Sequence, residues 1–355
     1  MPLISSKNNF DIIRILAAIQ VMLIHCCEHF GIPVESSLIL KVLAMFPGVP
    51  IFFFVSGFLI SASFERTNSL RDFYINRFLR IYPGLWLCLI FSLGIVLLSP
   101  QVEFEFLDML LWVIAQASAF QFYNPSFLRG FGVGVLNGSL WTIVVEIQFY
   151  LMIPLIYWLF SRAKWRLSFV VPLLFILISI NQVYVYAVKP ENSMLSKLLG
   201  VSLLPYLYMF LFGVVSQRNI LHLKGVTGAA GLPLMSIVYI SSSVVLGWLG
   251  LNVAGNNINP ISACLISLLA LALAYSRLKL LVKIKLPDIS YGIYIYHMLV
   301  VNCVLEYSEI QGLEAVSLSV VVTLFISSAS WYLVEKPCLK LKRNGLKLNK
   351  HRGTL

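Results

Sequence analysis

Two basic side chains in the first apolar segment have types and a spacing that could serve chemistry. Arg14 and His25, in DIIRILAAIQVMLIHCCEH, are 11 residues apart. In a helix this spacing is about three full turns, so both would point the same way with a rise of roughly 16 Å between them. A cation near the cytoplasmic end and a titratable base deeper on one face suit a long substrate entering from the cytoplasm. The alternative is an arginine that snorkels to the headgroups and a histidine that bonds a neighbouring helix.

Four other polar residues lie where lipid or its surface is expected. Arg77 and Arg80, in RFLRIYP, are one helical turn apart. This spacing suits a clamp on phosphate groups, and it equally suits plain anchoring at the cytoplasmic surface. Glu146 and His297 lie inside apolar segments, where an ionisable group is costly unless it has a partner or a water-filled cavity. Ordinary hydrogen bonding between helices is the simpler interpretation of both.

A metal site is not expected. His25 and His29 are spaced i, i+4, but HCCEH lacks the glutamate placement of HExxH and no third ligand is apparent. The six cysteines contain no CxxC pair, and most lie in apolar runs, where cysteine behaves as a small hydrophobe. Neither a zinc site nor a disulfide framework is therefore predicted.

The composition indicates the elements that would position these residues. Of the 355 residues, 59% are hydrophobic and 12% are charged, and the mean hydropathy is +0.88. An average soluble domain carries about 25% charged residues, so this chain cannot cover a water-facing surface. Its long, unbroken apolar runs differ from the ~10-residue alternating segments of transmembrane β-barrels. We therefore expect an all-α polytopic membrane protein and exclude a disordered chain or a large soluble enzyme.

Eleven segments are apolar enough to consider as membrane helices, at roughly 20 residues per span. They lie near 10–30, 39–63, 81–99, 105–121, 139–160, 167–188, 200–217, 226–250, 260–276, 288–306 and 313–334. The segment 105–121 is the weakest, because it is short and carries acidic residues at its start. The stretch 65–80, in which apolar residues alternate with arginines, is typical of an amphipathic helix on the cytoplasmic interface.

The distribution of Lys and Arg orients these segments. If the N-terminus is cytoplasmic and 105–121 does not cross, 22 of the 26 Lys and Arg residues are cytoplasmic. Only Lys41, Arg129, Lys189 and Lys197 then lie outside. The positive-inside rule thus favours a bundle of about ten transmembrane helices with both termini cytoplasmic, and a re-entrant or interfacial segment near 105–121. The net charge of +11 is a topology signal that needs no nucleic acid to explain it.

The chain is predicted to form one transmembrane domain over residues 1–335. No internal repeat and no linker separates two domains, and no small-residue cleavage site follows the first apolar run. Residues 336–355 form a basic cytoplasmic tail, which suits contact with anionic membrane lipids.

These motifs resemble those of the membrane acyltransferase-3 family, which includes bacterial O-antigen and other surface-glycan O-acetylases. The first marker is Arg14, ten residues, then His25; the second is Arg77-Phe-Leu-Arg80. Four further stretches match in character and order: FFFVSGFLIS at 52–61, SLWTIVVEIQFYL at 139–151, SYGIYIYHMLV at 290–300 and VEKP at 334–337. The resemblance covers essentially the whole chain.

The resemblance implies acyl transfer, with acetyl the expected group, from cytoplasmic acyl-CoA to a hydroxyl of an extracytoplasmic glycan. The implied acceptor is lipid-linked or polymeric, such as the O-antigen of lipopolysaccharide or an exopolysaccharide. The implied location is the bacterial inner membrane. Acetyl-CoA would be a donor substrate, and no permanently bound cofactor is implied.

The resemblance also implies roles for single residues on the donor side. Arg14, Arg77 and Arg80, together with Tyr82, would bind acyl-CoA, since its phosphates are drawn to a cationic cluster. Glu335 would support this arrangement by pairing with Arg14.

On the acceptor side, His25 would deprotonate the acceptor hydroxyl as a general base. Direct acylation of His25 is a second chemically possible route, and the two stay open. Glu146 would act with it by orienting either His25 or the acceptor, and His297 would support the site.

Two other classes of function fit part of the pattern. A transporter or exporter would use the same intramembrane charges as a substrate path, but transporters usually carry internal repeats and paired broken helices. A scaffold for polysaccharide assembly would need none of these side chains for chemistry. Acyl-CoA-dependent labelling of a glycan separates both from an acyltransferase.

Overall fold

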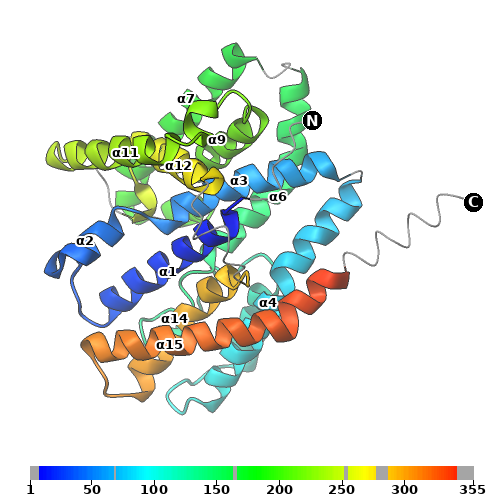
Figure 1. Cartoon of the computed structure of the whole chain (residues 1–355). Helices are drawn as coiled ribbons and strands as arrows, with labels where there is room; N and C mark the ends of the chain where they lie inside the picture. Colours follow the sequence, from blue (N-terminus) through cyan, green and yellow to red (C-terminus); the bar gives the residue numbers. More distant parts are fainter. Residues whose placement is uncertain (1–7, 68, 163–165, 252–254, 277–286, 342–355) are drawn as a thin grey trace, which may run out of the picture. The chain divides into compact units, whose positions relative to one another are not determined.

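The computed structural model describes residues 8–67, 69–162, 166–251, 255–276 and 287–341 (Figure 1). In these ranges every regular element is a helix and no strand occurs, which confirms the all-α prediction. A helix satisfies its backbone hydrogen bonds within one segment, so long apolar runs take this form in lipid.

A helix lies at each of the eleven predicted segments. In chain order they are α1 (Phe10–His29), α2 (Leu38–Ala44) with α3 (Gly48–Arg66), α4 (Leu70–Leu98), α5 (Phe106–Ala117), α6 (Trp141–Arg162), α7 (Leu167–Val183), α9 (Leu207–Arg218), α11 (Gly231–Trp248), α12 (Pro260–Tyr275), α14 (Ser290–Tyr307) and α15 (Gly312–Ser330). Shorter helices, including α8 (Met194–Gly200) and α10 (Lys224–Thr227), connect them. The π-helical turns η3 (Tyr184–Val188) and η7 (Trp331–Glu335) extend α7 and α15.

Seven of the described helices are long and apolar enough to cross a membrane, or eight if the bent pair Met194–Gly200 and Leu204–Arg218 is one span. The 16-residue α12 is shorter, and the 18-residue α14 carries His297, Asn302 and Glu306, which lower its hydropathy. The described helices are therefore compatible with the expected bundle of about ten transmembrane helices. The 12-residue α5 is too short for a span of roughly 20 residues, in keeping with a re-entrant or interfacial position.

Two helical boundaries differ from the sequence-based expectation. The segment 39–63 is broken between α2 and α3 at Pro47-Gly48, because proline has no backbone N–H to donate and its ring clashes with the preceding helical turn. The Gln20 side chain supplies hydrogen-bond partners on both sides of this break. Its Nε2 donates to the Leu43 carbonyl (3.3 Å), and its Oε1 accepts from the Gly48 amide (2.7 Å). The stretch 65–80 is not a separate helix: α3 ends at Arg66, and α4 runs on through Pro83.

The chain divides into two compact units. The first comprises Met1–Val21, Leu38–Arg66 and Thr142–Leu286, and the second comprises Met22–Ser37, Thr67–Trp141 and Pro287–Leu355. The boundary falls inside α1, after Val21, so this one helix belongs to both units. A single domain over 1–335 stays a prediction, and most of the predicted tail lies outside the described residues.

In the first unit, α3 and α9 approach closely through two glycines. A Cβ at Gly57 would lie 2.1 Å from the Phe210 carbonyl oxygen, and one at Gly213 would lie 2.3 Å from that of Phe54. Around this crossing, an apolar core joins the start of α1 to α3 and α12 through Phe10, Phe58, Leu271 and their neighbours. Ser61 of α3 also donates to Gln217 of α9 (2.9 Å), so polar bonding adds to the close fit of these two helices.

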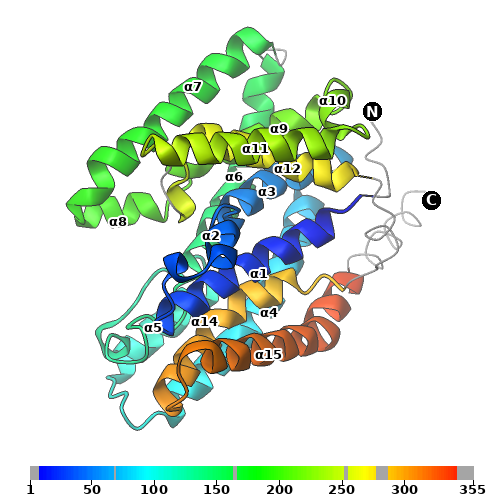
Figure 2. The ribbon, with the colours of Figure 1, turned by 60° about the vertical axis from the view of Figure 1, so that its left-hand side comes forward.

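In the second unit, α14 lies alongside α4 and α15 (Figure 2). It buries 14 of its 18 residues, among them His297 and Asn302. The Tyr291 hydroxyl donates to the Ile81 carbonyl of α4 (2.9 Å). The close approach at Gly84, where a Cβ would lie 2.9 Å from the Tyr291 ring, lets the two helices pack tightly.

Candidate functional site

Two histidines that are 272 positions apart meet in the second unit. His25 near the end of α1 and His297 in α14 place Nδ1 and Nε2, respectively, 2.9 Å apart. Their rings stack with centroids 5.2 Å apart and planes 25° from parallel. His297 has no exposed surface, whereas His25 is partly exposed. The structure thus joins a buried imidazole to an accessible one.

A backbone carbonyl fixes which nitrogens carry protons in this pair. His297 Nδ1 lies 3.1 Å from the carbonyl oxygen of Ile293, one turn earlier in α14. A carbonyl oxygen only accepts, so His297 Nδ1 carries the hydrogen, and Nε2 of the neutral ring is an acceptor. His25 Nδ1–H then donates to it. In neutral His25, Nε2 therefore holds the lone pair that can take a proton.

His29 provides a contrast within the same helix. It follows His25 by one helical turn, and the two ring centroids are 6.3 Å apart. Among the described residues no hydrogen bond to the His29 side chain is found. Only one of the two neighbouring histidines in α1 is therefore oriented by a buried partner.

A loop between α5 and α6 is bound along the face of α14. The amides of Gly132 and Val133 donate to Glu306 (3.0 Å) and Asn302 (2.7 Å). Further along, Asn137 Nδ2 donates to the Ile295 carbonyl (2.7 Å) and Ser139 Oγ to that of Tyr294 (3.1 Å). These bonds fix residues 132–139 beside the stretch of α14 that contains His297.

The two arginines of the RxxR motif have different neighbours. Arg80 Nη2 lies 2.6 Å from Asp288 Oδ2, and both side chains are about 15% exposed. Asp288 Oδ1 accepts from Ser290 Oγ (2.7 Å), which holds the carboxylate at the start of α14. The Arg77 guanidinium lies 5.8 Å from the centroid of the Phe73 ring. Asp288 is thus a fixed counter-charge for one member of the predicted phosphate clamp.

Tyr82 lies among aromatic rings on α4. It stacks on Phe78 with centroids 4.6 Å apart and meets Trp86 edge-on at 5.7 Å. Trp86 in turn donates its ring N–H to the Ala117 carbonyl at the end of α5 (3.0 Å). Among the described neighbours, these contacts give Tyr82 a packing position on α4; its acyl-CoA contact stays a prediction.

Glu146 has local partners in the first unit. Its Oε1 accepts from Tyr150 one turn later in α6 (2.5 Å) and from Ser56 of α3 (3.1 Å). Two hydroxyl donors thus hold one carboxylate oxygen at a half-buried position.

Glu335, in the π-helical turn after α15, is 2% exposed. Its Oε1 accepts from Ser330 Oγ (2.9 Å), and the Tyr296 hydroxyl lies 3.1 Å from that same Ser330 oxygen. This chain links α15 to α14, so Glu335 has a structural anchor within its own unit. Its predicted pairing with Arg14 stays a prediction.

Arg14 is half-buried in the first turns of α1. The helix is unbroken from Phe10 to His29, so the 11-residue spacing of Arg14 and His25 is a helical one, as predicted. Arg14 and Glu146 belong to the first unit, and the other six predicted site residues belong to the second. The structure joins His25 to His297 directly and gives Arg80 a counter-charge.

Three contributors to these contacts were not singled out from the sequence. Asp288 is an acidic residue beside the basic 277–285 stretch, and that position was a usable signal. Tyr150 is spaced i, i+4 from Glu146, a spacing at which a hydroxyl reaches a carboxylate. Ser56 gave no signal, because its contact with Glu146 joins two helices. In the described ranges no group of three His, Cys, Asp or Glu could hold a metal ion.

The fold and the histidine pair together define a polytopic membrane protein with an oriented acid–base group within its helices. Residues 7–334 match the family model of the acyltransferase domain. The chain therefore belongs to the acyltransferase-3 family, as its motifs indicated, and it is an enzyme of the O-acetyltransferase class.

Three relatives are similar to this chain over different lengths. Nodulation protein 10 of Rhizobium leguminosarum bv. viciae is 30% identical over 95% of this chain and 94% of its own length. The O-acetyl transferase of Shigella phage Sf6 is 29% identical over 93% and 95%. The peptidoglycan O-acetyltransferase OatA of Listeria monocytogenes is 34% identical over 31% of this chain and 19% of its own length. No solved structure matches the chain.

Proposed function

We propose that this enzyme transfers an acetyl group from cytoplasmic acetyl-CoA to a hydroxyl of an extracytoplasmic glycan, with His25 as the general base. The observation that carries the proposal is the chain from His25 Nδ1 to His297 and the Ile293 carbonyl. It leaves His25 Nε2 as the lone-pair atom of a partly exposed imidazole. A neutral imidazole titrates in the range that general-base catalysis requires.

The proton and the acyl group move in a balanced sequence. The acceptor O–H gives its proton to His25 Nε2 as the hydroxyl oxygen attacks the thioester carbonyl. The tetrahedral intermediate collapses, the carbon–sulfur bond breaks, and His25 returns the proton to the leaving thiolate to give CoA. His297 is a positioning residue, because its Nε2 accepts from His25 Nδ1–H throughout and stabilises the imidazolium. The alternative in which His25 is itself acylated uses the same Nε2 atom.

The donor site draws on the arginines. Arg14, Arg77 and Arg80 bind the phosphates of acyl-CoA by charge-assisted hydrogen bonds, and Tyr82 contributes to the same site. Asp288 orients the Arg80 guanidinium through the 2.6 Å contact. In this proposal Glu335 supports Arg14, and Glu146 orients His25 or the acceptor. No permanently bound cofactor takes part.

The acceptor is a lipid-linked or polymeric surface glycan, such as an O-antigen, and the location is the bacterial inner membrane with both termini cytoplasmic. The distribution of Lys and Arg supports this orientation. The Listeria relative is a peptidoglycan O-acetyltransferase by name, which supports a cell-surface glycan as the class of acceptor.

The test follows the position of a label in acetyl-CoA. Membranes that contain the enzyme receive acetyl-CoA labelled either in the acetyl group or in the CoA moiety, and the lipid-linked glycan fraction is recovered. We expect base-labile acetyl label in that fraction and no CoA label. Bound acetyl-CoA without label in any glycan would overturn the acceptor class, and uptake of an intact solute without chemistry would overturn the function.

A further inference from the structure

The connection between α5 and α6 in the second unit is long and rich in glycine. Residues 118–140 contain, as regular structure, the short 3₁₀ turn η2 (Ser126–Leu128). Connections longer than about 15 residues without longer elements of their own are uncommon and usually functional. Residues 130–138 include four glycines, and glycine loses more conformational freedom on ordering than any other residue. A fixed shape for this loop therefore needs strong restraints.

Asn302 of α14 supplies such a restraint. Its side chain is fully buried, and its Oδ1 accepts from the Val133 amide (2.7 Å). Its Nδ2 lies within hydrogen-bond distance of three carbonyl oxygens, those of Val135 (3.1 Å), Leu136 (2.9 Å) and Met298 (2.9 Å). A side-chain amide has two N–H donors and one acceptor oxygen, so Asn302 uses all of them. One side chain thus clamps the loop to the helix.

The loop meets this clamp at Gly132. The φ of Gly132 is +53°, in the left-handed region, and a Cβ there would lie 2.0 Å from Asn302 Oδ1. Gly130, two residues earlier, differs, because a Cβ there meets nothing within 4 Å. Two glycines of the same loop therefore separate contact with Asn302 from the general flexibility of glycine.

The bonds between loop and helix extend from the level of His297 to the end of α14. They begin at the Tyr294 and Ile295 carbonyls and end at Glu306. From His297 to Glu306 the helix rises roughly 14 Å. Under the proposed topology, α14 begins on the cytoplasmic side and ends outside. The loop thus lies along the part of α14 that an extracytoplasmic acceptor passes on its way to His25.

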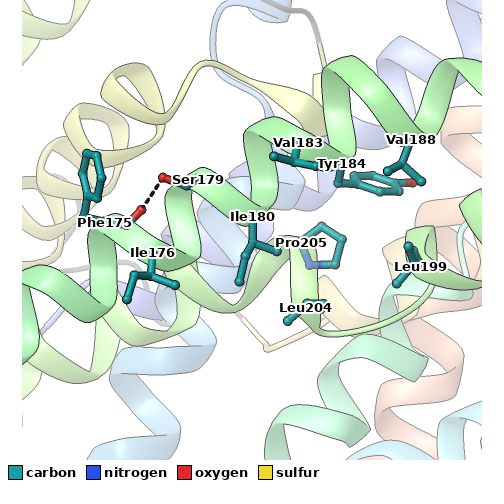
Figure 3. A pocket seen from close by; sticks show the side chains of 10 residues that line it. All are labelled: Phe175, Ile176, Ser179, Ile180, Val183, Tyr184, Val188, Leu199, Leu204 and Pro205. Atoms are coloured by element: carbon teal, nitrogen blue, oxygen red, sulfur yellow. Dashed lines mark hydrogen bonds between the residues drawn. The ribbon is translucent and has the colours of Figure 1, made fainter.

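The clamped loop also presents polar groups. Gly132 and Gly138 are exposed, and a glycine has only backbone atoms, so their exposure presents peptide groups that can bond sugar hydroxyls. The hollow along α7 in the first unit, shown in Figure 3, is different. Its lining is mostly apolar, and its Ser179 hydroxyl already donates to the Phe175 carbonyl (3.0 Å). A glycan, which carries many hydroxyl groups, is matched by the loop and not by that hollow.

We propose that residues 132–139 form the outer wall of the acceptor site and contact the glycan, and that Asn302 is a positioning residue that keeps this wall in its binding shape. The inference rests on the proposed function, which supplies an extracytoplasmic glycan acceptor. A loosened loop holds the binding shape for only a fraction of the time, and the apparent affinity falls by that fraction. Loss of the clamp therefore weakens acceptor binding and leaves acetyl-CoA binding unchanged.

A kinetic test loosens the clamp from both sides. Asn302→Asp keeps the acceptor for the Val133 amide but replaces the Nδ2 donor with an oxygen that the three carbonyls repel. Gly132→Ala places a methyl group against Asn302, and Gly130→Ala is the matched control. The acceptor is surface polysaccharide purified from cells that lack this enzyme.

We expect both clamp variants to raise the KM for this polysaccharide about tenfold. Their kcat and their KM for acetyl-CoA should stay within about twofold of the wild type, and Gly130→Ala should match the wild type in all three constants. A purely structural role for Asn302 predicts less folded protein with normal constants. Normal KM for the polysaccharide in the clamp variants, or an equal rise in both KM values, would overturn the proposal.

Hydrogen exchange tests the loop in the wild-type enzyme. In nanodiscs, the same polysaccharide should slow amide exchange in residues 132–139 several-fold, and acetyl-CoA alone should not. Asn302→Asp should speed exchange in this segment and leave α3 and α9 unchanged. Equal exchange of the wild-type loop with and without polysaccharide would show that the loop does not contact the acceptor.

The two tests keep this inference separate from the proposed function. Protection of residues 132–139 by a polysaccharide that is never acetylated would remove the function and leave the loop as a glycan-binding site. Acetylation with an unprotected loop and normal KM values in the clamp variants would leave the function and remove this inference.

Discussion

The two units bury their central helices by different means. Where α3 crosses α9 in the first unit, Gly57 and Gly213 bring backbone against backbone, and the surrounding contacts are aromatic, such as Phe149 against Phe210 with ring centroids 4.1 Å apart. In the second unit, α14 is buried together with His297 and Asn302, and a hydrogen-bonded loop lies along it.

The contacts at the α3–α9 crossing depend mainly on close steric fit, whereas those along α14 depend on hydrogen bonds between buried polar groups. Small residues let helices approach closely in a membrane, and a side chain added at such a crossing has no space. Burial of imidazole and amide groups is costly unless each is hydrogen-bonded, so the α14 network is a place where polarity is retained despite its cost. We therefore expect substitutions at the α3–α9 crossing to change the amount of folded protein, and substitutions beside α14 to change turnover.

The largest effect is expected at the glycine crossing. Gly57→Leu should eliminate folded protein, because even its Cβ would lie 2.1 Å from the Phe210 carbonyl oxygen. The measurement is the monodisperse yield after mild detergent extraction. Gly247→Leu in α11 is the control, since a Cβ there meets nothing within 4 Å, and it should extract like the wild type. Equal yields of folded protein from both variants would show that the close approach at Gly57 is not required for folding.

The next effect is expected at His297. His297→Leu should lower kcat about 100-fold with the KM for acetyl-CoA unchanged, because a lost partner leaves His25 unoriented. His297→Gln should have a kcat about tenfold higher than that of His297→Leu. An amide oxygen can accept from His25 Nδ1–H while the amide nitrogen donates to the Ile293 carbonyl. Steady-state kinetics in nanodiscs give both constants. A purely structural role for His297 predicts lower yield and normal kcat in the surviving protein.

A smaller effect, on the affinity for the acyl donor acetyl-CoA, is expected at the RxxR arginines. Arg77→Ala and Arg80→Ala should each raise the KM for acetyl-CoA about tenfold, because a hydrogen bond to a charged group is worth about 1.5–3 kcal/mol. Arg71→Ala, an exposed arginine on the same helix, is the control. Direct CoA binding measures the effect, and equal affinities for all three variants would identify the RxxR arginines as membrane anchors.

The smallest effect is expected at Asp288. Asp288→Asn keeps a hydrogen-bond acceptor for Arg80 but removes the charge, so the KM for acetyl-CoA should change only about threefold. A loss as large as that of Arg80→Ala would place the carboxylate itself in the donor site. The same binding assay decides between these outcomes.

The sequence predicted the parts of this structure that depend on local pattern. Apolar runs located a helix at all eleven predicted segments, and helical spacing placed Arg14 and His25 along one unbroken helix. The break between α2 and α3 has a sequence signal in Pro47-Gly48, a helix-breaking pair. Only the contact of Gln20 with the two sides of the break could not be predicted, because Gln20 belongs to another helix.

In the candidate site, too, the sequence predicted the features that depend on local pattern and missed those that depend on contacts between helices. Family motifs identified His25 and His297 as separate residues, but their contact joins positions 272 apart and depends on how α1 and α14 pack. The hydrogen bond from His297 to Ile293 is local, with the i, i−4 spacing of a helical turn. Its significance for the protonation of His25 follows only once the two rings are brought together.

The most direct test of the account compares two histidines one turn apart in α1. Purified His25→Ala and His29→Ala enzymes, in equal amounts, are assayed for acetyl-CoA binding and for acetyl transfer. Loss of a general base should lower kcat about 10³-fold in His25→Ala with acetyl-CoA binding retained, and His29→Ala should stay within about twofold of wild type. Equal turnover in the two variants, or loss of acetyl-CoA binding in His25→Ala with turnover retained, would contradict the assignment of His25 as the base.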